Sequence, residues 1–323
     1  MAGTYLVTGG AGFIGSSLVR ALLAEGRRVR VLDNFLTGFR ANLQEVLADV
    51  ELVEGDIRDA DACAKACAGA EVVFHHAALP SVPRSMEDPR TSFHCNTVGT
   101  FNMLVAARDA GVRRFLFAAS SSAYGAALDL PKREAMPVMP LSPYAADKAC
   151  GEMWLATFYR AFGLQTLSLR YFNIFGPRQD PTNQYAGVIA AFATAMIRGR
   201  RPTIFGDGTQ SRDFTFIDNV VRANLLGAKA PETHGEVVNI GCGEAIDLNG
   251  MVAAFNKVLG TDLAAVYAPP RAGDVMHSLA DIQAARRLIG YEPQVRFAEG
   301  LARTIEWYRW AIGAGYGGWA TMR

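Results

Sequence analysis

Short apolar runs alternate with amphipathic runs along most of the chain. The apolar runs predict buried strands at residues 4–8, 28–33, 50–53, 72–78, 115–119, 166–170 and 237–241. Between the first two, Leu18, Leu22 and Leu23 recur at helical spacing in the run 16–24. Further helices are expected at 93–110, from 143 onward, and at 188–197. Strands that alternate with helices in this way predict an α/β fold with a doubly wound parallel sheet of the Rossmann type.

A glycine-spaced turn follows the first predicted strand directly. Gly9, Gly12 and Gly15 have the spacing G-x-x-G-x-x-G, with Phe13 and Ile14 between the last two. Gly9 permits a tight turn, Gly12 lets the backbone approach a pyrophosphate, and Gly15 lets the new helix pack closely on the strand. The unpaired N–H groups at the helix start then face the phosphates. Because the motif ends a strand and opens a helix, it predicts a dinucleotide site.

The ends of the next strands carry acidic, small or polar residues. Asp33 ends the second strand, about 20 residues beyond the glycines, where a carboxylate accepts hydrogen bonds from the ribose of NAD and repels the 2′-phosphate of NADP. Asp56 follows the third strand and is a candidate to face the adenine amino group, and Ala77-Ala78 would let the backbone pass close to the cofactor. For His75 and His76 we expect satisfied core histidines.

The fifth predicted strand runs into three hydroxyls, Ser120, Ser121 and Ser122, where a parallel sheet opens to ligands. The helix that follows carries Tyr144 and Lys148, which share one face because they are four residues apart. A lysine ammonium beside the phenol, together with the positive end of the helix dipole, would lower the tyrosine pKa from its usual value of about 10. The pair predicts a tyrosine base that works near neutral pH.

Composition narrows the class of protein. The chain has 323 residues, 50% of them hydrophobic, which is typical of a soluble globular protein with a substantial core. Its 32 basic and 31 acidic residues leave a net charge of +1, so we expect no nucleic-acid or membrane partner. With no leader pattern and no apolar run of ~18 residues, a cytoplasmic protein is expected. The five cysteines lack metal-site spacing, so we expect no metal and interpret Cys63 and Cys67 as apolar fillers.

Four motifs together resemble those of the extended short-chain dehydrogenase/reductases, and among them the nucleotide-sugar 4-epimerases. They are the glycine stretch 8–15, the serines before Tyr124-Gly125, the Tyr144-x-x-x-Lys148 pair, and Arg170-Tyr171-Phe172-Asn173. The resemblance covers essentially the whole chain. It implies NAD as the cofactor, bound by Gly9, Gly12, Phe13, Ile14, Gly15, Asp33, Asn34, Asp56, Ile57, Ala77, Ala78, Asn96, Tyr144, Lys148 and Tyr171.

The resemblance also implies roles on the substrate side. The serine four residues before Tyr124 is the one that pairs with the catalytic tyrosine, which singles out Ser120, with Ser121 and Ser122 nearer the sugar. The run of three serines leaves this register open. Asn173, Arg212 and Arg271 match positions that hold the UDP diphosphate, and Asp274 matches one that binds the uridine ribose. Guanidinium forks suit pyrophosphate oxygens.

Local sequences resemble a subgroup, the bacterial UDP-N-acetylglucosamine 4-epimerases that feed surface polysaccharides. They are Ser81-Val82-Pro83-Arg84-Ser85, Gln179-Asp180-Pro181 with Tyr185-Ala186, and Asp274-Val275-Met276-His277-Ser278. In that subgroup a small residue at the place of Ser278 leaves room for an N-acetyl group, whereas a tyrosine limits the enzyme to the plain hexose. The expected substrate residues are Ser81, Val82, Arg84, Ser122, Asn173, Arg212, Arg271, Asp274 and Ser278.

The chain is expected to form an NAD-binding domain, 1–175, completed by about 210–245. A smaller UDP-sugar-binding α/β lobe, 176–209 and 246–323, would accompany it. The usual dimer of the family is built from two helices of each protomer, and the runs 101–110 and 154–162 carry apolar residues suited to an isologous four-helix contact.

Other activities compete with this interpretation. A 4,6-dehydratase or a decarboxylating synthase of the same family needs an acid beside the strand-end hydroxyl, where this chain has Ser121 and Ser122. A non-enzymatic dinucleotide sensor would keep the glycines but could lose Tyr144 and Lys148. The sequence favours 4-epimerisation of a UDP-hexose through a 4-keto sugar, first of all UDP-N-acetylglucosamine. UDP-glucose and a UDP-uronate remain alternatives.

Overall fold

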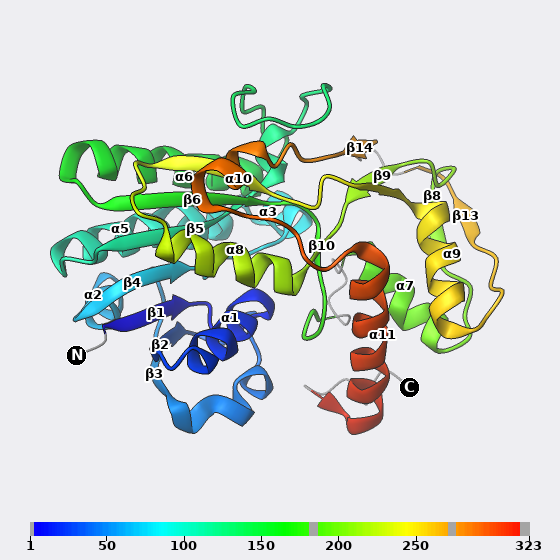
Figure 1. The fold of residues 1–323 in the computed structure, drawn as a ribbon, viewed down its shortest axis with the longest axis horizontal. Coiled ribbons are helices and arrows are strands. Elements are labelled where there is room, and N and C mark those ends of the chain that lie inside the picture. Colours follow the sequence, from blue (N-terminus) through cyan, green and yellow to red (C-terminus); the bar gives the residue numbers. More distant parts are fainter. Residues whose placement is uncertain (1–2, 181–186, 271–275, 317–323) are drawn as a thin grey trace.

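The computed structural model describes residues 3–180, 187–270 and 276–316 (Figure 1). Its centre is a seven-stranded sheet in the order β11-β6-β5-β4-β1-β2-β3, in which every neighbouring pair is parallel. The strands are β1 (Thr4–Thr8), β2 (Arg28–Asp33), β3 (Val50–Glu54), β4 (Ala70–His75), β5 (Arg114–Ser120), β6 (Gln165–Tyr171) and β11 (Glu236–Ile240). The predicted Rossmann-type fold is confirmed, including the late strand, which lies beside β6 at the edge of the sheet.

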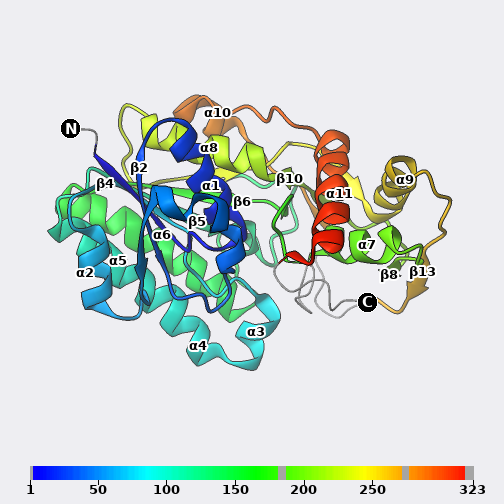
Figure 2. The ribbon, with the colours of Figure 1, turned by 90° about the horizontal axis from the view of Figure 1, so that it is seen from below.

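Helices cover both faces of the sheet (Figures 1 and 2). One face carries α1 (Phe13–Ala24), α8 (Ile217–Lys229) and α10 (Gln283–Ile289), and the other carries α2 (Ala60–Cys67), α5 (Gly99–Asp109) and α6 (Pro143–Phe162). Because successive side chains of a strand point to opposite faces, Val7 enters the core under α1 while Leu6 enters the core under α2 and α5. Cys63 and Cys67 are fully buried in the second core, as expected of apolar fillers.

Three predicted elements have different bounds in the structure. The first helix begins at Phe13, directly after Gly12, and the fourth strand ends at His75. The helix predicted at 93–110 is divided into α4 (Pro89–Phe93), a wider π-helical turn (His94–Val98) and α5, and α3 (Val82–Glu87) precedes it. This π-helical turn directs the Asn96 side chain to the backbone of Leu79. The hydrophobic periodicity of the sequence does not reveal such a contact.

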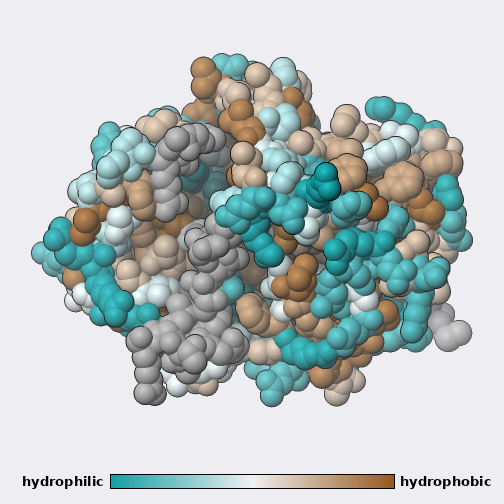
Figure 3. Space-filling view, turned by 180° about the vertical axis from the view of Figure 1, so that it is seen from behind, coloured by the Kyte–Doolittle hydropathy of each residue, from teal (hydrophilic) through white to brown (hydrophobic). Residues whose placement is uncertain are grey.

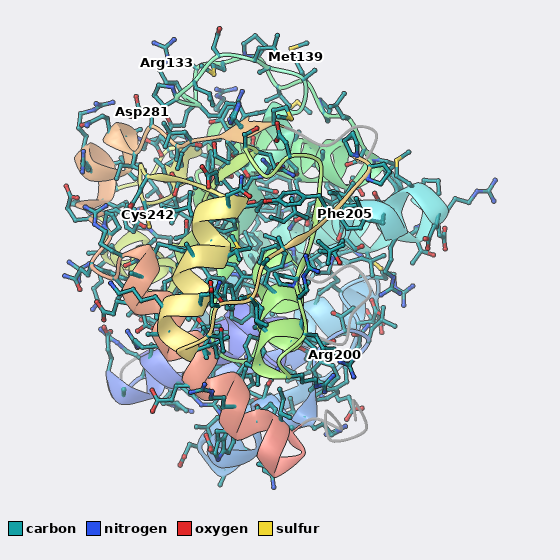
Figure 4. The ribbon with its side chains drawn as sticks, turned by 90° about the vertical axis from the view of Figure 1, so that its right-hand side faces the viewer. Arg133, Met139, Arg200, Phe205, Cys242 and Asp281 are labelled. Atoms are coloured by element: carbon teal, nitrogen blue, oxygen red, sulfur yellow. The ribbon has the colours of Figure 1, made fainter. Side chains whose placement is uncertain are left out.

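A second group of elements forms a lobe beside the sheet (Figure 1). Its helices α7 (Val188–Ile197), α9 (Leu248–Leu259) and α11 (Phe297–Ala314) pack against one another (Figure 4). Its short strands pair as β7 (Ile174–Phe175) with β10 (Thr215–Phe216), β8 (Thr203–Phe205) with β13 (Val266–Ala268), and β9 (Ser211–Asp213) with β12 (Ala245–Asp247) and β14 (His277–Ser278). The apolar core runs from under α1 into this lobe, and the exact domain limits stay a prediction.

A segment between β5 and α6, residues 125–142, projects from the body (Figures 1 and 4). Figure 3 shows hydrophobic atoms, in brown, at the top of the molecule. The exposed apolar side chains of the segment are Leu128, Leu130, Val138, Met139 and Leu141. The base of the segment is tied down because the carboxylate of Glu134 accepts from the backbone N–H of Asn239 at 2.7 Å. The segment therefore forms a fixed rim above the ends of β5 and β6.

A buried ion pair joins the sheet to α6. The guanidinium of Arg170 on β6 donates to both carboxylate oxygens of Glu152 at 2.6 and 2.7 Å, and the two side chains are only 3% and 6% exposed. The same guanidinium lies 4.7 Å from the ring centroid of Tyr124. Burial raises the pKa of Glu152, and the neighbouring Arg170 opposes that change. This pair fixes the helix that carries Tyr144 and Lys148 against the sheet.

Candidate active site

A cleft of about 910 Å³ follows the carboxyl ends of β1, β2, β4, β5 and β6, with residues after β7 and from β9 and β14 opposite. The cofactor residues predicted from the sequence that line it are Gly9, Gly12, Phe13, Ile14, Gly15, Asp33, Asn34, Asp56, Ile57, Ala77, Ala78, Tyr144, Lys148 and Tyr171. The strand ends and the lobe thus face one common space, and open parallel sheets bind their ligands at the carboxyl ends of the strands.

The glycine turn has the shape of a phosphate cradle. Gly9 has a φ of +68°, and a Cβ there would lie 2.7 Å from the backbone nitrogen of Ala77. A Cβ on Gly15 would lie 2.1 Å from the carbonyl oxygen of Gly9, so only glycine allows α1 to approach the turn. Among the described residues no side chain caps α1 at Gly12, which leaves the first-turn N–H groups for an anion. The turn therefore fits a dinucleotide diphosphate.

The carboxylate of Asp33 is held by the backbone at this end of the cleft. One oxygen accepts from the N–H of Ala11 and the other from the N–H of Phe35, each at 2.8 Å. Burial raises the pKa of Asp33, and these backbone hydrogen bonds oppose the rise. Nearby, the Asn34 amide donates to Asp56 at 2.7 Å, and the Arg58 guanidinium lowers the pKa of Asp56 to about 2. Fixed acceptors of this kind suit the hydroxyl and amino groups of an adenosine.

Asn96 is the predicted cofactor residue that does not line the cleft. It is 2% exposed, its Oδ1 accepts from the N–H of Leu79 at 2.7 Å, and its amide donates to the Leu79 carbonyl and to Ser92. The π-helical turn directs this side chain at the loop after β4, and a direct contact of Asn96 with the cofactor stays a prediction. Asn96 supports the cleft wall through Leu79.

The two histidines after β4 differ. His75 shares hydrogen bonds with Thr8 and Thr100 and is a satisfied core residue, as expected. The expectation is wrong for His76, because neither of its two buried ring nitrogens has a hydrogen-bond partner among the described residues. Its ring stacks on that of Tyr171 at 6.2 Å, and burial with nearby Lys148 lowers its pKa to about 3. His76 is therefore a neutral ring in the cleft wall.

The predicted catalytic side chains converge at the end of β5. Ser120 lies beside Tyr144, where its hydroxyl counteracts the rise of the phenol pKa, and the Ser122 hydroxyl donates to Ser120 at 2.9 Å. Ser121 lines the same cleft, and Lys148, 4% exposed, donates to the carbonyl oxygen of Ala118 at 2.7 Å. The contact between Ser120 and Tyr144 agrees with the register in which Ser120 is the partner of the tyrosine.

The expected lowering of the Tyr144 pKa by Lys148 is wrong for the protein alone. Burial raises the pKa of Tyr144, opposed only by the hydrogen bond from Ser120, and it lowers that of Lys148 to about 8. The Lys148 nitrogen lies 5.9 Å from the Tyr144 ring centroid and 4.7 Å from that of Phe117. The hydrogen bond that the structure shows for this ammonium goes to the carbonyl oxygen of Ala118, on the neighbouring strand β5.

The lobe side of the cleft holds the predicted substrate residues that the structure describes. Ser81, Val82, Arg84, Ser122, Asn173, Arg212 and Ser278 all line it. Ser278 pairs with Arg212 across β14 and β9, and the guanidinium of Arg212 donates to the Met276 carbonyl at 3.0 Å. Arg271 and Asp274, like Tyr185-Ala186, lie outside the described residues, so their predicted roles stay predictions.

Several cleft residues were not predicted from the sequence. They include Tyr124, Lys132, Arg178 and Gln179. Arg178 has a φ of +70°, an uncommon conformation for a residue other than glycine, and burial together with nearby Arg20 lowers its pKa. The position of Arg178 in Gly176-Pro177-Arg178-Gln179, shortly after the predicted substrate residue Asn173, could have indicated that it lines the cleft. Lys132 had no such signal, because a loop brings it to the cleft from the projecting segment.

The described parts of the chain contain no group of three or more His, Cys, Asp and Glu side chains that could hold a metal ion. In the same ranges, none of the helices combines the length and the apolar content that crossing a membrane requires.

Comparison with known proteins agrees with this geometry. Residues 5–241 match the model of the "NAD dependent epimerase/dehydratase family". A UDP-glucose 4-epimerase of Mycolicibacterium smegmatis is 42% identical over 308 residues, 94% of this chain and 98% of the relative. A solved UDP-N-acetylglucosamine 4-epimerase from Methanobrevibacter ruminantium, in complex with UDP-N-acetylmuramic acid, has a TM-score of 0.91 at 36% identity, covering 95% of this chain and 98% of that one.

A second solved structure carries the cofactor. The UDP-glucose 4-epimerase of Thermus thermophilus in complex with NAD has a TM-score of 0.85 at 36% identity, covering 95% of this chain and 99% of that one. The glycine turn, the held carboxylate of Asp33 and the Tyr144 group are consistent with these matches. The chain belongs to the NAD dependent epimerase/dehydratase family and is an enzyme that uses NAD.

Proposed function

We propose that the protein catalyses NAD-dependent 4-epimerisation of a UDP-hexose, with UDP-N-acetylglucosamine and UDP-N-acetylgalactosamine as its main pair. The observation that carries this proposal is the joint position of Tyr144, Ser120 and Lys148 in one cleft with the glycine turn. Relatives of comparable similarity are named for UDP-glucose and for UDP-N-acetylglucosamine, so the choice of sugar rests on this chain's own residues. We place the reaction in the cytoplasm, supplying surface-polysaccharide synthesis.

In the proposed reaction Tyr144 handles the proton of the sugar 4-hydroxyl. The phenolate oxygen accepts this proton in the oxidation step and returns it in the reduction step, after the keto sugar has rotated in the cleft. NAD, when held by the glycine turn and Asp33, would supply the redox chemistry of the reaction, which is reversible hydride transfer at C4 of the sugar. Ser120 lies beside the phenol and orients it in the proposed reaction, and the Ser122 hydroxyl, which donates to Ser120, extends the chain of hydroxyl groups.

The reaction places two requirements on the substrate: its diphosphate must stay anchored, and its keto sugar must be free to rotate. We therefore place the charged contacts to the diphosphate on the lobe. Arg212 and Asn173 lie there in the cleft wall, and Arg84 lies across from them on α3. The side-chain amide of Asn173 donates to the Asp213 carbonyl at 3.1 Å, which fixes its direction. We assign Arg212 and Asn173, with Arg271 and Asp274, to the UDP moiety.

A dehydratase or decarboxylase remains the alternative within the family. Both need a carboxylate beside the Ser120 hydroxyl, where the structure has Ser121 and Ser122. A conversion assay with UDP-glucose, UDP-N-acetylglucosamine and UDP-glucuronate separates these outcomes by mass. An epimerase gives a product of unchanged mass, whereas loss of water or carbon dioxide would replace the proposal with a lyase.

We expect NAD to bind at least about tenfold more tightly than NADP. The carboxylate of Asp33 is fixed by two backbone N–H groups, so it cannot swing away from a 2′-phosphate. Calorimetric titration of the protein freed of nucleotide measures both affinities. In the Asp33→Asn variant the ratio of the NADP and NAD dissociation constants should decrease, because the negative charge is lost while one acceptor oxygen remains. Tighter binding of NADP by the unmodified protein would contradict the assignment.

Replacing Ser278 by tyrosine should lower kcat/KM for UDP-N-acetylglucosamine by at least about tenfold and leave that for UDP-glucose nearly unchanged. A phenol ring in a packed wall excludes the volume that the N-acetyl group needs, at a cost of about 1–3 kcal/mol. Ser278→Ala is the matched control, since it keeps the space and removes only the hydroxyl. If both substrates lose activity equally, Ser278 does not select the sugar.

We also propose a homodimer through α5 and α6. Their outer surface carries Phe101, Met153 and Phe162, which are 36%, 64% and 53% exposed, and Trp154 lies 4.8 Å from Phe101 between ring centroids. An isologous contact would bury these side chains in a four-helix interface. Light scattering at micromolar concentration should give twice the mass of the chain, and Met153→Glu should shift it toward the monomer. A monomeric mass for the unmodified protein speaks against this contact.

A further inference from the structure

Both backbone polar groups of Ala11, inside the glycine turn, make hydrogen bonds to other parts of the chain. Its N–H donates to Asp33, and its carbonyl oxygen accepts from the Phe39 N–H at 3.0 Å and from the Asn42 amide at 2.8 Å. Asn42 ends the short 3₁₀ turn Arg40–Asn42 and is only 1% exposed. The orientation of the turn that faces the phosphates therefore depends on a side chain from a neighbouring loop.

Asn42 is in turn held by the lobe. Its Oδ1 accepts from the hydroxyl of Tyr316 at 2.8 Å, which leaves the Asn42 amide free to donate to Ala11. Tyr316 follows α11, and its ring packs against Trp307 and Trp310 with centroids 5.2 and 5.6 Å apart. Two consecutive side-chain hydrogen bonds thus connect the last helix of the lobe to the glycine turn.

Tyr316 also lies near a charged group of the cleft wall. Burial raises the pKa of Tyr316 and the nearby Arg178 guanidinium opposes that rise, and Arg178 lines the cleft with a left-handed backbone at φ +70°. Such a conformation costs free energy and persists only where its surroundings enforce it. Tyr316 therefore lies between a charged group of the cleft wall and the support of the glycine turn.

We propose that Tyr316 is a positioning residue for the cofactor, which acts through Asn42 to hold the glycine turn in the shape that binds the NAD diphosphate. A glycine turn that already has its bound shape binds the diphosphate more tightly and retains it longer, because no conformational entropy of the turn is lost on binding. Loss of the Tyr316 hydroxyl frees the Asn42 side chain to rotate and weakens its hold on Ala11. This inference concerns the cofactor alone and does not depend on which sugar the enzyme takes.

The test measures NAD release from the purified holoenzyme by exchange against labelled NAD. Tyr316→Phe removes one hydroxyl and should speed release by about three- to tenfold, the effect of one hydrogen bond. The matched control is Tyr267→Phe, because the Tyr267 hydroxyl donates to an asparagine oxygen, Asn249 Oδ1, at 2.9 Å on the exposed lobe surface. This control should release NAD within about twofold of the unmodified protein.

A double variant tests whether the tyrosine acts through Asn42. Asn42→Ala should speed release by itself, and adding Tyr316→Phe to it should change the rate no further, since neighbours in one chain of hydrogen bonds are not additive. The proposal is overturned if Tyr316→Phe releases NAD at the unmodified rate, if Tyr267→Phe has an equal effect, or if Tyr316→Phe keeps its full effect on the Asn42→Ala background. If Asn42→Ala does not fold, the comparison of the two tyrosines decides.

Discussion

Replacing Tyr144 by phenylalanine should lower kcat for 4-epimerisation by about 10²–10⁴-fold while KM for the UDP-sugar changes little. The substitution removes the group that takes the proton from the sugar hydroxyl, and it leaves Arg212 and the other diphosphate contacts in place. Steady-state kinetics on the holoenzyme measures both constants. Tyr159→Phe is the control, because Tyr159 lies on the same helix but does not line the cleft.

The pH dependence adds a second readout. Burial raises the pKa of Tyr144 above its usual value, so the neutral phenol is the resting form near neutral pH. A base acts only when deprotonated, and a raised pKa moves the rising part of its rate profile toward alkaline pH. We therefore expect kcat/KM to increase with pH across the neutral range and the increase to vanish in Tyr144→Phe. A variant that keeps more than about a tenth of the rate would show that the phenol is not the base.

Replacing Glu152 by glutamine should destabilise the fold by about 3–5 kcal/mol. The Arg170 side chain is 3% exposed and loses the carboxylate that it pairs with, so its guanidinium would remain buried without that compensating charge. The free energy of unfolding, from urea titration at saturating NAD, measures the effect. The change is nearly isosteric, so lost volume does not explain a large value.

An exposed ion pair supplies the control. Glu54 and Arg40 form the same type of pair, but both side chains are 60% exposed. Glu54→Gln should cost less than about 1 kcal/mol, because water solvates the remaining guanidinium. Equal effects of the two substitutions would mean that burial does not set the strength of the Glu152 pair.

The parts of the site that follow strand ends could be predicted from the sequence. The glycine turn is specified by local geometry, since Gly9 needs a positive φ and Gly15 lies against the Gly9 carbonyl. Asp33 ends β2, Ser120 ends β5 and is followed by Ser121 and Ser122, and parallel strands bring their carboxyl ends to one edge. Such residues are found by counting along the chain.

Other parts depend on contacts that no local pattern contains. Asn96 points to Leu79 because a π-helical turn rotates it, and Lys148 bonds Ala118 of the neighbouring strand instead of Tyr144. Tyr316 reaches Asn42 only once the lobe has packed on the sheet. In each case tertiary packing determines the hydrogen-bond partner. Residue spacing in the sequence can indicate the region where a side chain lies, but not the atom that it contacts.

The position of β11 at the sheet edge has a consequence for chain synthesis. A growing polypeptide that has emerged only as far as the end of β6 leaves Gln165–Tyr171 as an open edge, with backbone N–H and C=O groups unpaired. Residues 236–240 close that edge, and residues 172–235, which contain part of the lobe and α8, must leave the ribosome first. Until then the nascent sheet can pair with a strand of another chain, so slow translation through the lobe should favour aggregation.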